Sequence, residues 1–222
     1  MRFINGESPI DLDFSHLVVA GWTGRDQKAI AHHIDELAAL GVAPPSATPL
    51  YYRVAAATLT TAPRIEVVGT GSSGEVEPMV VQHGARRFLG LGSDHTDRVL
   101  EAHSVALSKQ VCAKPCAAAL WPWEEVEDHL DRLVCESWIF ENGSWVAYQA
   151  GTLASIRPLA ELAAGAGLNV LGIDGPVAML CGTFGAAGGV RPARRFRMRL
   201  SDPDRARAIG HEYETIVLPE VA

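Results

Sequence analysis

Two glutamates placed two residues apart in an apolar run constrain the fold of this chain more than any other feature. The run GEVEPMVV begins at Gly74, and a second apolar run, FLGLGSD, ends at Asp94. Residues i and i+2 of a β-strand point to the same face, so Glu75 and Glu77 should stand side by side. A second strand could bring Asp94 to the same place, and a hard cation would hold three carboxylates together. From the glutamate pair alone, a solvent-facing strand is the commoner case.

Composition narrows the class of protein. The 222 residues are 48% hydrophobic and 20% charged, which is ordinary for a globular chain with a sizeable core. The net charge of -7 disfavours nucleic acid or an anionic membrane as a partner. We expect a cytoplasmic protein, because no basic segment leads into an apolar leader and no apolar run could span a bilayer. The cysteines form no C-x-x-C pair, which favours reduced core residues over a zinc site.

Turn signals and periodicity predict a mainly β or α+β fold in a single domain covering residues 1–222. Asn5-Gly6 indicates an N-terminal hairpin within residues 1–20, and Asn142-Gly143 indicates a second hairpin between strands near 133–140 and 144–150. A helix and its loop are expected over 24–45, and further helices over 97–110 and 157–166. No βαβ rhythm is present, so the strands should form a mixed sheet with a few peripheral helices.

Other polar residues stand where chemistry is conceivable. His33 and Glu36 lie one helical turn apart and suit a general base with its orienting carboxylate, although surface pairs of this kind are more common. Lys114 lies in the apolar segment VCAKPCA, where a lysine either extends to solvent or has a function. Thr183 lies in the glycine-rich segment GTFGAAGG, which is weak as a phosphate motif.

The order of these pieces resembles the fumarylacetoacetate hydrolase superfamily, and most closely a bacterial branch known only as a domain of unknown function. That superfamily carries a His-x-x-Glu on a lid helix, an E-x-E pair, a D-x-T-x-R segment, a later lysine and a late glycine-threonine loop. Here the matching segments are AHHIDEL, GEVEPMVV, SDHTDRV, VCAKPCA and CGTFGAAGG. Arg53 stands where relatives commonly have a lysine.

The resemblance implies a rolled, mixed β-sheet, a homodimer and a small oxo-acid substrate. It implies that Glu75, Glu77 and Asp94 bind Mg²⁺ or Mn²⁺, with Ca²⁺ able to bind in vitro. It further implies that Arg53, Arg98 and Thr183 bind the substrate. His33, oriented by Glu36, would activate water when the lid closes, and Lys114 would add positive charge; His95 or His103 are the next candidates for the base.

The activity implied is metal-dependent hydrolysis of a C–C bond in an acylpyruvate-like or β-diketo acid. A lyase on the same site, an oxaloacetate-type decarboxylase or a dienoate hydratase or isomerase, is the alternative. A catalytically silent oxo-acid-binding protein is the second alternative. Three departures bear on the substrate: Gly74 stands where relatives usually have a histidine, the segment from Glu77 to Asp94 is shorter than usual, and Glu101 stands where some relatives have a glutamine.

Overall fold

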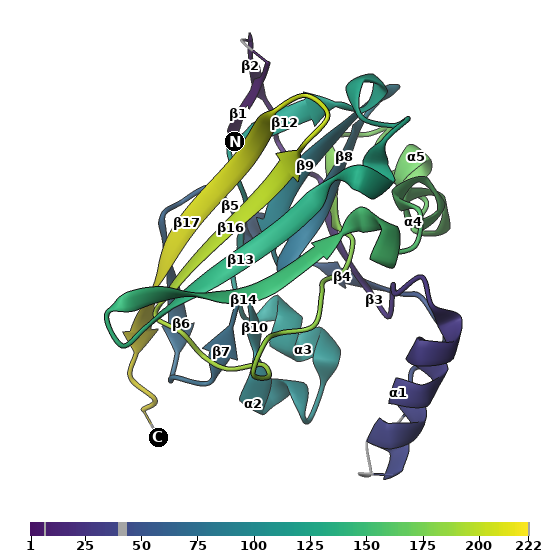
Figure 1. Cartoon of the computed structure of the whole chain (residues 1–222). Coiled ribbons are helices and arrows are strands. Elements are labelled where there is room, and N and C mark those ends of the chain that lie inside the picture. Colours follow the sequence, from purple (N-terminus) through teal and green to yellow (C-terminus); the bar gives the residue numbers. More distant parts are fainter. Residues whose placement is uncertain (7, 40–43, 222) are drawn as a thin grey trace.

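The computed structural model describes residues 1–6, 8–39 and 44–221, without the side chains of residues 33 and 36–39. Two sheets pack face to face (Figure 1). In the described part of the chain, the larger sheet has eight strands in the order β2 (Ser8–Asp11), β1 (Arg2–Asn5), β12 (Ala119–Pro122), β9 (Arg86–Ser93), β8 (Val76–His83), β15 (Val177–Leu180), β3 (His16–Gly21) and β4 (Leu50–Val54).

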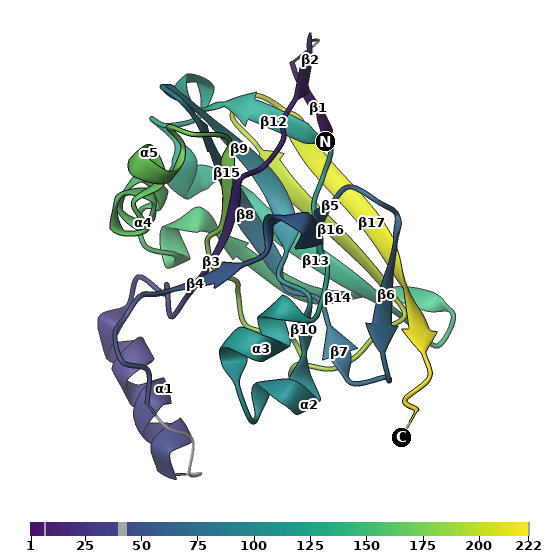
Figure 2. The same cartoon turned by 180° about the vertical axis from the view of Figure 1, so that it is seen from behind.

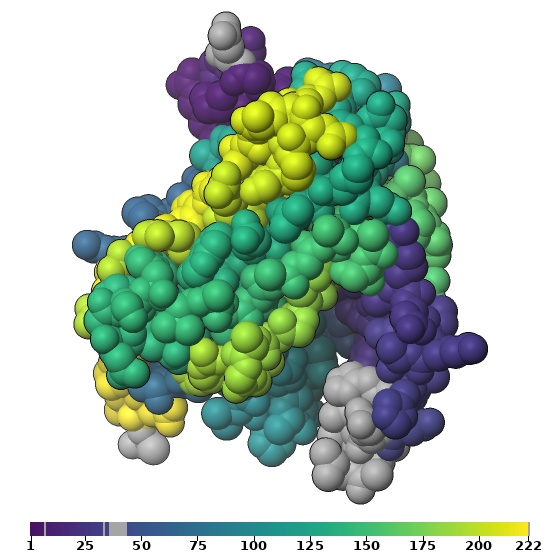
Figure 3. All heavy atoms as spheres, in the orientation of Figure 1, coloured from purple at the N-terminus to yellow at the C-terminus, as the bar shows by residue number. Residues whose placement is uncertain are grey.

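The smaller sheet covers one face of the larger one. Over the same described residues it has five strands in the order β14 (Ser144–Thr152), β13 (Val134–Glu141), β16 (Arg195–Asp202), β17 (Arg207–Leu218) and β6 (Arg64–Val68). Side chains of these strands form much of the face that Figure 3 shows. Two short ladders join β7 (Ser72–Ser73) to β10 (Thr96–Asp97) and β5 (Leu59–Thr60) to β11 (Lys114–Pro115).

The helices are short and lie at the edges of the sheets (Figure 2). They are α1 (Gln27–Ala39), α2 (Arg98–Glu101), α3 (Val105–Gln110), α4 (Leu159–Gly165) and α5 (Leu168–Leu171), with 3₁₀ turns η1 (Ala56–Thr58), η2 (Trp123–Glu125), η3 (Leu130–Arg132) and η4 (Leu153–Ser155). None of the described helices is long and apolar enough to cross a membrane. The rolled, mixed, mainly β architecture that the resemblance implied is confirmed.

Strand β8 explains why the sheets pack as they do. All of its residues except the last are buried, because both of its faces meet a hydrophobic core. Val76 and Val80 belong to the larger core between the two sheets, whereas Met79 and Val81 belong to a smaller core on the opposite face. Alternation along a strand therefore places Glu77 on the side of the smaller core. A charged residue there needs partners, since burying an isolated carboxylate is costly.

Two expectations about local elements are corrected. The N-terminal hairpin ends at Asp11, and residues 16–21 instead form β3 inside the larger sheet, parallel to β15. The helix expected over 97–110 is two helices. Asp97 caps α2 by accepting hydrogen bonds from Val99 N and Leu100 N, and Ser104 caps α3 by accepting one from Leu107 N. Serine at a cap competes with helix continuation, so the second cap starts a new helix axis.

Candidate metal centre and pocket

The three acidic side chains predicted to meet do meet. Strands β8 and β9 form an antiparallel hairpin in which Val76 pairs with Ser93, so the residues that flank this end, Glu75 and Asp94, are neighbours. Asp94 N donates a hydrogen bond to Glu75 O over 3.0 Å. One carboxylate oxygen from each of Glu75, Glu77 and Asp94 lies within 4.8 Å of the others. That separation is about twice the ~2.0–2.6 Å distance between Mg²⁺ or Ca²⁺ and an oxygen ligand.

Asp94 is fully buried between two lysines. Lys109 Nζ donates a hydrogen bond to Asp94 Oδ2, and Lys114 Nζ lies 3.3 Å from Asp94 Oδ1 without hydrogen-bond geometry. Lys114 is itself fully buried and donates to His95 O (2.5 Å) and Cys112 O (3.2 Å). The apolar setting of Lys114 therefore reflects a built ion pair with Asp94, not a side chain that reaches solvent.

Arg98 contacts three side chains at the edge of the cluster, two of them carboxylates. Its Nε donates to Ser73 Oγ (2.7 Å), its Nη1 donates to Glu101 Oε2 (2.9 Å), and its Nη2 lies 3.3 Å from Glu75 Oε1. These carboxylates raise the pKa of the guanidinium despite its burial. The arginine of the D-x-T-x-R segment, Arg98, thus fixes the positions of Glu75 and Glu101 beside the cluster.

The pKa values show an imbalance of charge in the cluster. Burial raises the pKa of Glu75, and burial together with the charges of Asp94 and Glu75 raises that of Glu77 well above its ordinary value. Burial also opposes ionisation of Asp94, but Lys109 and Lys114 outweigh it and lower the pKa of Asp94 to about 2. Two carboxylates are consequently reluctant to ionise, and added positive charge would remove that penalty.

The donor set fits a hard divalent cation. It offers oxygen ligands only, which suits Mg²⁺, Mn²⁺ or Ca²⁺ better than zinc or copper. Asp94 Oδ1 is buried and accepts no hydrogen bond among the described residues, as expected of a ligand atom. Glu75, Glu77 and Asp94 are therefore the residues that would hold a metal.

The loop after β15 holds the carboxylate of Glu77 by a hydrogen bond from its backbone. Gly182 N donates a hydrogen bond to Glu77 Oε2 over 2.7 Å. Gly182 has a φ of +101°, and a Cβ built there would lie 1.8 Å from Thr23 Oγ1, so only glycine fits without rearrangement. The hydroxyl of Thr183 donates to Val76 O (2.8 Å), so in this geometry it secures the loop to β8.

Gln149 joins the same loop to the acidic strand, although nothing in its sequence setting marked it. Its Oε1 accepts hydrogen bonds from Val76 N (2.9 Å) and Ser137 Oγ (3.1 Å). Its Nε2 donates to Thr183 Oγ1 and Phe184 O, each over 2.8 Å. The pairing of β13 with β14 shifts at this point, from Ser137 with Gln149 to Trp138 with Ala147, so the residue next to Gln149 on β14 is an extra, bulged one. No periodicity rule could have identified Gln149, because its partners come from distant parts of the chain.

The structure also gives a reason for Gly74, at the position where the resemblance leads one to expect a histidine. A Cβ at this position would lie 2.3 Å from Tyr213 Oη and 2.9 Å from a carbon of Phe196. Tyr213 Oη in turn contacts Ser93 Oγ and His95 Nδ1, each at 2.9 Å. Burial lowers the pKa of His95 to about 3, so this ring is a neutral part of the support behind Glu75.

A pocket of about 450 Å³ is lined by Glu75 and Glu77 of this cluster. Its walls come from the β3–α1 connection, β4, α2, α3 and the loop after β15. Its polar or aromatic lining residues are Trp22, Thr23, Tyr52, Glu75, Glu77, Glu101, Lys109 and Thr183. Lys109, which sequence reasoning missed, is the cation of this lining among the described residues. The signal that could have identified Lys109 is its position in α3, the short helix that Ser104 caps.

The remaining predicted residues are not all gathered at the pocket. Arg53 is exposed on β4, beside the pocket residue Tyr52, and alternation directs it to the other face of the strand. Position 33 follows the pocket residue Ile30 by one turn of α1, but the side chains of His33 and Glu36 lie outside the described residues. His103 is exposed. The roles predicted for these residues stay predictions.

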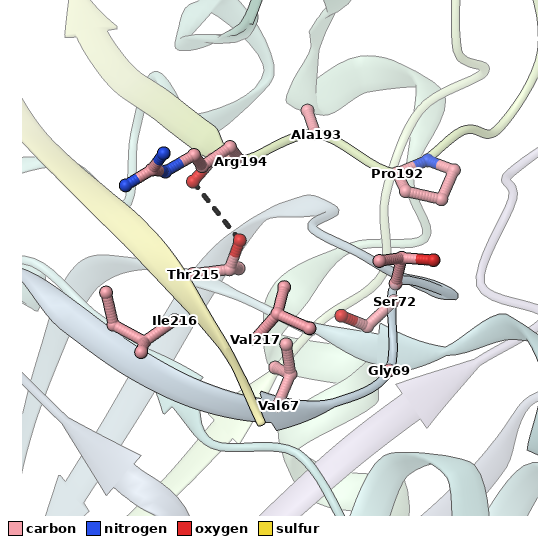
Figure 4. Close-up of a pocket in the computed structure, with 10 residues that line it drawn as sticks. Val67, Gly69, Ser72, Pro192, Ala193, Arg194, Thr215, Ile216 and Val217 are labelled. Atoms are coloured by element: carbon pink, nitrogen blue, oxygen red, sulfur yellow. Dashed lines mark hydrogen bonds between the residues drawn. The ribbon is translucent and has the colours of Figure 1, made fainter. Parts of the chain in front are cut away.

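A second pocket, of about 480 Å³, lies away from the carboxylates, beside β6 and β17 (Figure 4). Its lining is mainly apolar, with Val67, Ile216 and Val217 along the strands. Thr215 Oγ1 donates to Arg194 O over 3.2 Å, and the guanidinium of Arg194 is paired with Glu214 at 2.8 Å. This second pocket therefore presents no acidic cluster.

The architecture is similar to that of several solved structures. A fumarylacetoacetate isomerase/hydrolase candidate from Oleispira antarctica has a TM-score of 0.65 at 18% identity, over 96% of this chain and 99% of that chain. Fumarylpyruvate hydrolase from Pseudomonas aeruginosa, solved with Mn²⁺ and pyruvate, has a TM-score of 0.59 at 14% identity, over 99% and 96%. A 2-keto-3-deoxy-D-arabinonate dehydratase, solved with magnesium and 2,5-dioxopentanoate, has a TM-score of 0.62 at 13% identity, over 96% and 76%.

The fold is therefore that of the fumarylacetoacetate hydrolase superfamily, as the sequence resemblance predicted. The chain belongs to the family of proteins of unknown function called DUF2848, whose model matches residues 20–213. A comparison with curated proteins found no match.

Proposed function

We propose that this protein is a divalent-metal-dependent hydrolase that cleaves a C–C bond in a small acylpyruvate-like or β-diketo acid. The observation that carries the proposal is the convergence of Glu75, Glu77 and Asp94 beside a pocket that Glu75 and Glu77 line. Solved proteins of the same fold hold Mn²⁺ with pyruvate, or magnesium with 2,5-dioxopentanoate, which supports both the ion and the class of ligand. We extend the proposal to the homodimer that the resemblance implies.

The charges around the site favour an anionic substrate once a divalent ion is present. The cluster contains four carboxylates and three cations. With all four carboxylates ionised, as metal ligation requires of the triad, it carries one net negative charge, which a divalent ion would convert to one net positive charge. These residues are Glu75, Glu77, Asp94, Glu101, Arg98, Lys109 and Lys114. The bound ion would supply positive charge beside a carbonyl oxygen that becomes negative during the reaction. Lys114 and Arg98 hold the ligand carboxylates in place and add to this positive potential.

Hydrolysis requires a base for water, and we assign that role to His33, with Glu36 as its orienting partner. Ile30, one turn earlier on α1, lines the pocket, which supports an approach from this helix. Water attacks the distal carbonyl carbon, and the bond from that carbon to the neighbouring methylene breaks. The hydroxyl stays on the acyl carbon and the proton goes to the methylene carbon, which yields a carboxylic acid and pyruvate.

A lyase on the same site is the second candidate. The similarity to a 2-keto-3-deoxy-D-arabinonate dehydratase favours it, because that enzyme shares the fold and is solved with magnesium. Decarboxylation, hydration or isomerisation of an oxo acid would use the same carboxylates and cations without water attacking a carbonyl. The products distinguish these reactions.

The test is turnover of acylpyruvates and oxaloacetate with and without Mg²⁺ or Mn²⁺, with pyruvate and carbon dioxide as readouts. Metal-dependent pyruvate release from an acylpyruvate supports the hydrolase, whereas carbon dioxide release from oxaloacetate supports a decarboxylase. Glu77→Gln should abolish Mn²⁺ binding without loss of folding stability, because the buried carboxylate it replaces is reluctant to ionise. The exposed Glu66→Gln on β6 is the matched control. Undiminished Mn²⁺ affinity in Glu77→Gln would overturn the metal assignment.

A further inference from the structure

Three cations surround the acidic cluster, and their contacts differ in a way that identifies the one that can meet a ligand. Arg98 donates hydrogen bonds to Ser73 and Glu101, its Nη2 is buried 3.3 Å from Glu75 without hydrogen-bond geometry, and it is not among the residues that line the pocket. Its Nη1 donates a hydrogen bond to Glu101 Oε2 over 2.9 Å. A carboxylate at that position ties the guanidinium to the protein and adds a negative charge that would repel a substrate carboxylate.

Lys114 is also unsuited to direct binding. Its side chain is fully buried behind Asp94, and its ammonium group is bonded to two backbone carbonyls. Lys114 does not line the pocket, and its ammonium group could meet a ligand there only by leaving both carbonyls. Lys114 can therefore influence a ligand only through its charge.

Lys109 has the geometry that the other two cations lack. It stands on α3 in the wall of the pocket, together with Glu75 and Glu77. Its ammonium group pairs with Asp94 and lies 5.7 Å from the centre of the Tyr52 ring, which also lines the pocket. One carboxylate partner leaves donors available on an ammonium group, which has three.

We propose that Lys109 is the residue that holds the carboxylate of the substrate, and that it determines the preference of this site for a 2-oxo monocarboxylate. The assignment rests on the proposed function, because it places the carboxylate beside the metal-binding triad. It also defines the other end of the substrate. The described walls beyond Lys109 are uncharged at Trp22, Ile30 and Tyr52, and Glu101 would repel a second carboxylate, so the acyl end is small and neutral.

The experiment compares pyruvate with methyl pyruvate, an ester of the same shape without the negative charge. Binding of each to the Mn²⁺-loaded protein is measured by calorimetry, and Mn²⁺ binding is measured separately by electron paramagnetic resonance of the free ion. The variants are Lys109→Met and, as a matched control, Lys28→Met, since Lys28 is exposed on α1. We expect Lys109→Met to bind Mn²⁺ at least as tightly as the wild type, because a neighbouring cation has been removed.

Pyruvate binding should weaken roughly ten- to a hundredfold in Lys109→Met, the scale of a charged hydrogen bond, while methyl pyruvate binding stays within about twofold. Lys28→Met should behave as wild type. If methionine prevents folding, Lys109→Gln keeps a donor for Asp94 and should show the same loss for pyruvate alone. Equal pyruvate affinity in wild type and variant, with Mn²⁺ bound in both, would overturn the assignment of Lys109 and leave the proposed function standing. Failure of the wild type to bind Mn²⁺ would overturn both.

Discussion

Replacement of Gly182 by alanine tests the loop that supports Glu77. An alanine at a φ of +101° costs about 1–3 kcal/mol of backbone strain. Its Cβ would lie 1.8 Å from Thr23 Oγ1, and relieving such overpacking costs about 1–3 kcal/mol more. We therefore expect Gly182→Ala to lower the free energy of unfolding by roughly 2–6 kcal/mol, a large part of the stability of an ordinary domain.

Two further variants separate these causes in urea unfolding experiments. Thr23→Ala moves the nearest atom to the new Cβ from 1.8 to 3.0 Å, so Thr23→Ala/Gly182→Ala should recover the packing part and keep the backbone part. Gly185→Ala is the matched control, because a Cβ at Gly185 meets nothing within 4 Å and its φ is not positive. It should lie within about 1 kcal/mol of wild type.

The same variants link the loop to the metal site. Displacing Gly182 weakens the 2.7 Å hydrogen bond to Glu77 Oε2, so Mn²⁺ affinity should fall in Gly182→Ala and not in Gly185→Ala. Equal unfolding free energies for these two variants would show that the close approach of Gly182 to Thr23 is not a feature of the folded protein.

Three other predictions concern groups that bind or transfer protons. Because the pKa of Glu77 is raised well above 4.5, protonation of Glu77 stabilises the metal-free fold, and this stabilisation is lost as the pH rises from 4.5 through the folded pKa. Mn²⁺ affinity should rise over the same pH range, because the ion displaces the proton. Calorimetry in buffers of different ionisation enthalpy would count the protons released. Asp94 acts with opposite sign, since its pKa of about 2 makes its stabilisation disappear only as pH falls from 3.8 through 2. His33→Ala should leave Mn²⁺ binding intact and lower turnover by about 10²-fold or more, and normal turnover would place the base elsewhere.

Local sequence carried much of the fold. Asn142 and Gly143 both have positive φ, at 48° and 82°, so the turn predicted for this hairpin is the one that forms between β13 and β14. Phe140 and Trp145 pair across that hairpin with ring centroids 5.4 Å apart. Such features depend on residues that are close together in the sequence, so they can be predicted from the sequence alone.

The features that the sequence did not predict depend mostly on contacts between residues far apart in the chain. The break between α2 and α3 depends on the cap at Ser104. The sequence pattern predicted a single helix because the helical spacing of apolar residues continues on both sides of this serine. Gln149 meets Val76 across 73 residues, and Arg53 shares a strand with Tyr52 yet faces away from the pocket. The prediction of a single domain and the lid role of residues 24–45 stay predictions.

The carboxylate triad was determined by the sequence itself, because Glu75 and Glu77 share a strand face by periodicity and Asp94 ends the next strand of the same hairpin. The choice among the three cations was made only by the tertiary structure. Each lies within 20 residues of Asp94 in the sequence, and local rules place none of them. Packing decides it: Lys114 is enclosed behind Asp94, Glu101 holds Arg98, and the short α3 presents Lys109 to the pocket.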